Sequence, residues 1–312
     1  MKAALTLPTW TGEPHPSPTR PRAIQLFALV LGALLAVSAA SAPDSPGLPD
    51  QSEAAESATF VPADYPRSET PDEGAGGSSH SGSPGSPETP SSTEHPLRPY
   101  TATYKTSARG LSLTLNRSLS MDDNGECRLT SEGRILVAGI QEVSVFTVEG
   151  EQIKPRSYVY QLSGPVSRRR EVHFDPTADV IRSLYKKEWY ELPKQPGTLD
   201  RMSQQEQLRL LLLNDPTPQD DIVLRVADGR KIKNYQLRFA GEEIIDTPMG
   251  PVITLMFERE HDEPERRSAF WVAPAWDYLM VKTLHVEDGR TTEANLISAS
   301  IEGTPLRGDS SA

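Results

Sequence analysis

The chain has 312 residues, a formal net charge of −11 and one cysteine, Cys127. A single cysteine excludes an intramolecular disulfide, and the acidic balance gives no general electrostatic reason to bind nucleic acid. The negative charge is concentrated in residues 43–97, where ten acidic residues accompany one basic residue. The acidity is therefore mainly a property of one segment. We expect Cys127 to be a small core residue on a strand.

The first 42 residues combine a polar, weakly basic start with an apolar run. Arg20 and Arg22 precede AIQLFALVLGALLAVSAASA, which ends in small residues. This order is typical of a secretory signal peptide. An uncleaved membrane anchor is the alternative, because the length of the apolar run is close to the roughly 17–25 residues that cross a bilayer. We expect an exported protein, either periplasmic or tethered to the inner membrane and facing the periplasm.

Residues 43–97 are rich in Ser, Pro, Gly and Glu and contain almost no aliphatic side chains. Such a segment cannot bury enough apolar surface to offset the entropy of ordering it. We therefore expect an export signal or anchor at 1–42, a disordered linker at 43–97, a single β-rich domain at 98–303 and a flexible tail at 304–312.

Within the domain, apolar and polar residues alternate with a period of two, first in residues 100–104 and again in 111–115. This alternation is typical of half-buried strands. Turn signals recur about every 8–12 residues, which indicates a large antiparallel sheet of roughly twelve strands rather than βαβ units. The hairpin signals are Asn124–Gly125, Glu149–Gly150, Asp228–Gly229 and Asp288–Gly289.

One helix is predicted, in GTLDRMSQQEQLRLLLLNDP at residues 197–216. Ser203 and Glu206 have the spacing of a capping box, in which each side chain accepts the other residue's backbone N–H. An apolar stripe follows at Leu208, Leu211 and Leu212, and Pro216 prevents continuation. A lone amphipathic helix needs a curved sheet to bury its stripe. The predicted fold is mainly β: a large curled antiparallel sheet (β-roll or open barrel) with this helix on its concave face.

Three segments of this domain carry a family resemblance: LDRMSQQEQL, YQLRFAGEEIIDTPMGPVITLMFERE and RRSAFWVAPAWDYLMVKTLHVEDGRTTEANLIS. They resemble the exported bacterial family known as domain of unknown function 3108, over about residues 99–302. Met280 departs from the pattern, which more often has proline there. The resemblance implies an envelope protein with a curled β-sheet and implies no activity. The matching positions are Asp200 and Ser203, Gly241 to Gly250, and Trp271, Ala273, Pro274 and Asp277.

The sequence contains no G-x-S-x-G elbow, H-E-x-x-H run, paired-cysteine motif or glycine-rich phosphate loop. His173, His261 and His285 fall on separate predicted elements without metal-ligand spacing, and no nucleophile has a neighbouring base. We expect no catalytic residue, no metal site and no cofactor. Helix capping explains Asp200 and Ser203 better than hydrolysis does.

Five residues are candidate ligand contacts. Arg168 and Arg170 share one strand face, where they could hold a phosphate or carboxylate, although charges that protect an edge strand are the alternative. Trp189, Trp271 and Tyr278 could form an apolar or sugar-stacking surface, and ordinary core packing is the alternative.

These observations favour a non-enzymatic envelope module that binds a lipid, glycan or partner protein. The alternatives are a scaffold that acts through its sheet edges and, with least support, a hydrolase. A cavity of several hundred Å³ would favour ligand binding, whereas a solid core with an exposed strand edge would favour the scaffold. We expect the membrane to be contacted only through an uncleaved N-terminal segment.

Overall fold

The computed structural model describes residues 96–108, 111–135, 138–165, 167–217 and 222–308. The expected export segment and nearly all of the expected linker lie outside these ranges. Among the described residues, no helix is long and apolar enough to cross a membrane. The elements are β1 (Tyr100–Ala108), β2 (Leu111–Met121), β3 (Cys127–Ile135), β4 (Ala138–Glu149), β5 (Gln152–Ser163), β6 (Arg168–Phe174), β7 (Val180–Tyr185), β8 (Glu188–Pro193), β9 (Thr198–Leu199), α2 (Ser203–Asn214), β10 (Ile222–Asp228), β11 (Lys231–Thr247), β12 (Gly250–Arg259), β13 (Arg267–Ala273), a 3-10 turn (Pro274–Trp276), β14 (Leu279–Glu287), β15 (Arg290–Ile301) and β16 (Thr304–Pro305).

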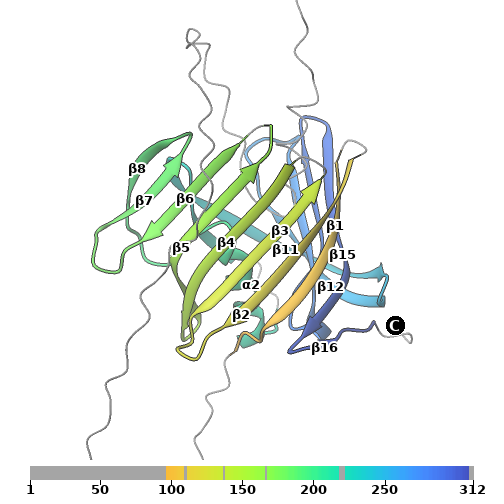
Figure 1. Ribbon diagram of the computed structural model, residues 1–312. Helices are drawn as coiled ribbons and strands as arrows, with labels where there is room; N and C mark the ends of the chain where they lie inside the picture. Colours follow the sequence, from red (N-terminus) through yellow and green to blue (C-terminus); the bar gives the residue numbers. More distant parts are fainter. Residues whose placement is uncertain (1–95, 109–110, 136–137, 166, 218–221, 309–312) are drawn as a thin grey trace, which may run out of the picture. The chain divides into compact units, whose positions relative to one another are not determined.

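The strands form one continuous sheet (Figure 1). From β8 to β1 neighbouring strands follow the reverse of chain order; β1 then pairs with β15, and the order runs back to β9. The pairings are antiparallel except for β9 with β10, and β16 pairs with β15. The backbone ladder does not close, because β8 lies at one end of this order and β9 at the other. The predicted fold class is confirmed.

The glycine turns predicted from the sequence all connect paired strands. Gly125, Gly150, Gly229 and Gly289 have φ between 59° and 77°, the left-handed region that glycine adopts without strain. The described residues contain sixteen strands rather than about twelve. The two-residue strands β9 and β16 are too short to show any alternation, which explains part of the difference. Cys127 is buried on β3, as expected.

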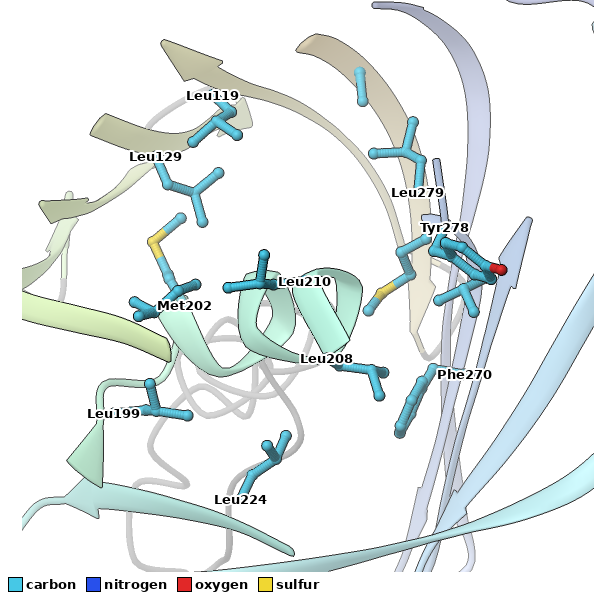
Figure 2. Close-up of a cluster of buried hydrophobic side chains, with 14 of the residues drawn as sticks. Leu119, Leu129, Leu199, Met202, Leu208, Leu210, Leu224, Phe270, Tyr278 and Leu279 are labelled. Atoms are coloured by element: carbon cyan, nitrogen blue, oxygen red, sulfur yellow. The ribbon is translucent and has the colours of Figure 1, made fainter. Parts of the chain in front are cut away.

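The helix α2 lies inside the curl of the sheet, as Figure 2 shows. Around it are side chains from β2, β3, β9, β10, β13 and β14. Leu208 and Leu212 are buried as predicted, but Leu211 is only partly buried and Leu210, outside the predicted stripe, is fully buried. The single-face prediction fails because the sheet surrounds the helix on several sides. Polar residues of α2 are consequently buried as well, including Glu206 and Arg209.

The helix cap differs from the predicted Ser203–Glu206 box. The Asp200 carboxylate accepts the backbone N–H groups of Met202 and Ser203, at 2.8 and 2.9 Å. The Ser203 hydroxyl accepts the N–H of Asp200 at 2.9 Å, so Ser203 takes the role expected of Glu206. The box is therefore shifted three residues towards the N-terminus. Glu206 is left free for a different role, as acceptor for the Tyr100 hydroxyl at 2.7 Å.

We expected the chain beyond residue 303 to be a flexible tail. Residues 304–308 nevertheless contact the domain. The N–H of Leu306 donates to the carbonyl of Ala299 at 2.9 Å, and that of Gly308 to the carbonyl of Met249 at 2.8 Å. Gly308 approaches Gly250 so closely that a Cβ on Gly308 would lie 2.4 Å from backbone atoms there. The last part of the predicted tail, residues 309–312, lies outside the described residues.

Candidate ligand site

The two ends of the sheet meet where β7 approaches the turn between β10 and β11. The Ser183 hydroxyl on β7 donates to the carbonyl of Gly229 at 2.7 Å. Gly229 has φ +65°, and a Cβ there would lie 3.1 Å from the Tyr185 ring. Side chains and close contacts thus join the two ends where the backbone ladder does not. We call this junction the seam.

A row of side chains crosses the sheet and leads to the seam. Strand register places Glu142 of β4 beside Tyr160 of β5, and Tyr160 beside Arg170 of β6. The Arg170 guanidinium carbon lies 5.9 Å from the centre of the Tyr160 ring and 5.0 Å from that of Tyr185. These are cation–π distances, so the two rings hold the guanidinium between them.

Across the seam, Asp228 at the end of β10 connects two cations. Arg201 Nη1 lies 3.8 Å from Asp228 Oδ1, and Lys233 Nζ lies 2.7 Å from Oδ2. The Arg259 guanidinium carbon is 3.5 Å from the centre of the Tyr235 ring. We call the whole set the arginine–tyrosine cluster: Glu142, Tyr160, Arg170, Tyr185, Arg201, Asp228, Lys233, Tyr235 and Arg259.

Within the arginine–tyrosine cluster, four cations accompany two carboxyl groups. Burial raises the pKa of Glu142 to about 7, although the charges of Arg201 and Arg170 favour ionisation. Burial also opposes ionisation of Asp228, but Arg201 and Lys233 outweigh it and lower that pKa. Burial lowers the pKa of Lys233 despite its contact with Asp228. Positive charge is therefore in excess in a partly desolvated place, which is a favourable setting for an anion.

The sequence comparisons are decisive about family. A model of a family described as protein of unknown function (DUF3108) matches residues 100–293. The chain belongs to the DUF3108 family. No curated protein matches its sequence.

Two solved structures resemble this DUF3108 protein at low identity. One is a beta-barrel-like protein of domain of unknown function DUF1849 from Brucella abortus, with 10% identity and a TM-score of 0.44, covering 66% of this chain and 98% of that one. The other is titled a "putative lipoprotein" from Parabacteroides distasonis, with 9% identity and a TM-score of 0.28, covering 66% of this chain and 96% of that one.

The residues predicted from the sequence to contact a ligand lie in separate places. Arg168 and Arg170 lie on the same face of β6, Arg168 exposed and Arg170 in the arginine–tyrosine cluster. Trp189 is 46% exposed on the edge strand β8, under the guanidinium of Arg182. Trp271 is buried on β13 and donates its indole N–H to Glu243 at 2.6 Å. Of these five residues, only Arg170 belongs to the arginine–tyrosine cluster.

Tyr278, the remaining candidate, follows the 3-10 turn in the chain. It is nearly buried and has φ +56°. It borders a space beside α2 whose volume is about 10 Å³. A second space beside the helix, lined by Leu208, Leu224 and Phe270 among others, is of the same size. Each holds no more than a single water molecule. The helix therefore fills the parts of the interior that these spaces border.

A group of polar residues on β13, on β14 and in the loop between β12 and β13 was not predicted from the sequence. Ser268 Oγ lies 2.8 Å from Nδ1 of His285 and 2.9 Å from Nε2 of His261. His285 Nε2 lies 3.6 Å from Glu287 Oε2, and burial lowers the pKa of both histidines, that of His261 to about 4. The expectation that no nucleophile neighbours a base is therefore wrong. Ser268 is only 3% exposed, however, so a substrate could not reach it without rearrangement.

Glu142 leads to a pH-dependent prediction. Because its pKa is higher in the folded state than in the unfolded state, the folded protein loses stability as pH rises from about 4.5 through 7. Glu142→Gln removes this loss and keeps an acceptor for the Tyr158 hydroxyl. At pH 8 we expect the variant to be more stable than the wild type by up to about 3 kcal/mol, and nearly equal to it at pH 5. Thermal unfolding at pH 5, 6, 7 and 8 checks this; a difference that does not change with pH would contradict it.

Proposed function

We propose that this DUF3108 protein is a non-enzymatic binding module of the cell envelope. Its ligand carries an anionic group that binds at the arginine–tyrosine cluster. The observation that carries the proposal is the excess of partly buried cations at the seam. A protein gains little stability from desolvated like charges, so their presence fits a ligand that neutralises them.

The small size of the spaces beside α2 supports a polar contact rather than an apolar one enclosed next to the helix. A lipid chain bound inside the sheet needs a cavity of several hundred Å³, whereas the spaces beside α2 measure about 10 Å³ each. The arginine–tyrosine cluster needs no such cavity, because Arg168 at its border is exposed. The ligand's anionic group would enter from that side, and the rest of the ligand would stay outside the sheet.

Native mass spectrometry of the full chain, purified from its own envelope, tests the proposal. We expect a retained ligand in the wild type and its loss in the double variant Arg170→Ala, Lys233→Gln. Arg182→Ala is the matched control, because Arg182 stacks on Trp189 at 4.8 Å and lies outside the arginine–tyrosine cluster. A ligand retained equally by the double variant would show that the cluster is not the binding site.

A further inference from the structure

We infer that the anionic group recognised at the arginine–tyrosine cluster is a phosphate monoester. This inference rests on the proposed function and names its ligand class. Arg170, Arg201, Lys233 and Arg259 contribute four positive charges, and Asp228 removes one. Depending on whether Glu142 is protonated, the excess is two or three charges. A phosphate monoester carries about −1.5 to −2 near neutral pH and offsets most of this excess, whereas a carboxylate or a phosphate diester, with one negative charge, offsets at most half of it.

The geometry supplies donors that suit phosphate. Arg170 is held between the rings of Tyr160 and Tyr185, so its planar fork of N–H groups is oriented before any ligand arrives. The Tyr185 ring on which it packs lies close to Gly229, so Arg170 lies next to the seam. Lys233 adds a point charge from the opposite side. Guanidinium and ammonium groups together are a frequent arrangement around a phosphate.

An independent observation comes from Glu142. Its side chain is 1% exposed, and its Oε2 has no hydrogen-bond partner within the described part of the chain. The other oxygen accepts the Tyr158 hydroxyl. A buried carboxyl with one unpaired oxygen is costly unless something binds there. When protonated, that oxygen can donate to a phosphate held by Arg170 only after side chains of the row move aside, because Glu142 is no more exposed than Ser268 and Tyr160 stands between Glu142 and Arg170.

The same phosphate monoester chemistry could come from a lipid headgroup or from a soluble phosphate. Three probes separate the sources: phosphatidylcholine vesicles containing phosphatidate, the same vesicles containing phosphatidylglycerol, and glycerol 3-phosphate in solution. Phosphatidate and glycerol 3-phosphate carry monoesters, and phosphatidylglycerol carries a diester. Binding of the full chain is measured by vesicle co-sedimentation and by calorimetry at pH 7.

We expect phosphatidate vesicles to bind about tenfold or more tightly than phosphatidylglycerol vesicles. Arg170→Ala should remove this preference, and Arg182→Ala should keep it. Both variants retain the N-terminal apolar run, so its own affinity for membranes cancels in the comparison. If Arg170→Ala lowers the melting temperature, Lys233→Gln replaces it as the test. Binding of glycerol 3-phosphate as well as phosphatidate supports a free phosphate as the source, and binding of phosphatidate alone supports a lipid headgroup.

Two results would overturn the inference. One is equal binding of the phosphatidate and phosphatidylglycerol vesicles, or a preference that survives in both Arg170→Ala and Lys233→Gln. The other is the absence of binding to all three probes while mass spectrometry still finds a ligand that the double variant loses. In that second case the proposed function stands and only the phosphate assignment fails.

Discussion

Leu210→Ala is expected to destabilise the domain by about 2–5 kcal/mol, the usual cost of truncating a buried leucine. Leu210 is fully buried on α2, where Figure 2 shows it between side chains of the surrounding sheet. Deleting its side chain removes apolar contacts and leaves a cavity that a sheet curled around the helix cannot easily fill. Since a domain is typically stable by only 5–15 kcal/mol, this is a large fraction of the total. Denaturant unfolding monitored by tryptophan fluorescence measures it.

The matched control is Leu211→Ala, one residue further along the same helix. Leu211 is only partly buried, so its truncation should cost clearly less than that of Leu210. The pair also separates a fixed helix from a movable lid. A fixed helix predicts a large loss at Leu210 and no uptake of an apolar dye below the unfolding transition. A small loss at Leu210 together with dye binding would mean that α2 can leave the interior, and an internal ligand site would then have to be reconsidered.

Local sequence patterns were sufficient for much of the fold. The four glycine turns, most of the alternating strands and the α-helix found among the described residues depend on neighbouring residues, and these were predicted. The pairing of β1 with β15 joins the two ends of the domain, and no local pattern encodes it. The burial of Leu210 depends on the same long-range closure, because a helical stripe predicts one buried face and a surrounding sheet buries several. The shifted cap has a local cause: Asp200 was available three residues before Ser203.

The candidate site was predicted only in part for the same reason. Alternation placed Arg168 and Arg170 on one strand face. The cations that accompany Arg170 in the cluster come from the turn that precedes α2 and from β11 and β12. Their approach depends on the seam, where the ends of the sheet meet, and a sheet's curvature cannot be inferred from its alternation. Ser268 and His285 were missed similarly, because their contact requires the register of β13 with β14.

A second network lies beside the helix, and it combines buried charges in a different balance. Glu206 lies 3.5 Å from Arg117 Nη2 and 3.3 Å from Arg209 Nη1, and it accepts the Tyr100 hydroxyl. The side chains of Glu206, Arg117 and Arg209 are each no more than 4% exposed. Arg209 also contacts Asp277, at 3.6 Å. One carboxylate thus neutralises much of the charge of two buried guanidinium groups.

Glu206→Gln should therefore be strongly destabilising, by about 3–5 kcal/mol, because it leaves two buried cations without their shared counter-charge. The substitution preserves size and an acceptor for Tyr100, so the loss reports charge rather than packing. Glu142→Gln is its matched contrast: it is the same substitution at another buried glutamate, where we expect a gain in stability at pH 8. Unfolding both variants at that pH compares them directly. Equal effects of the same sign would mean that the two buried carboxyl groups are not distinguished by their surroundings, and both electrostatic interpretations would fail. Opposite signs are expected because Glu206 lies between two close guanidinium groups, whereas burial opposes the ionisation of Glu142 more strongly than its neighbouring cations favour it.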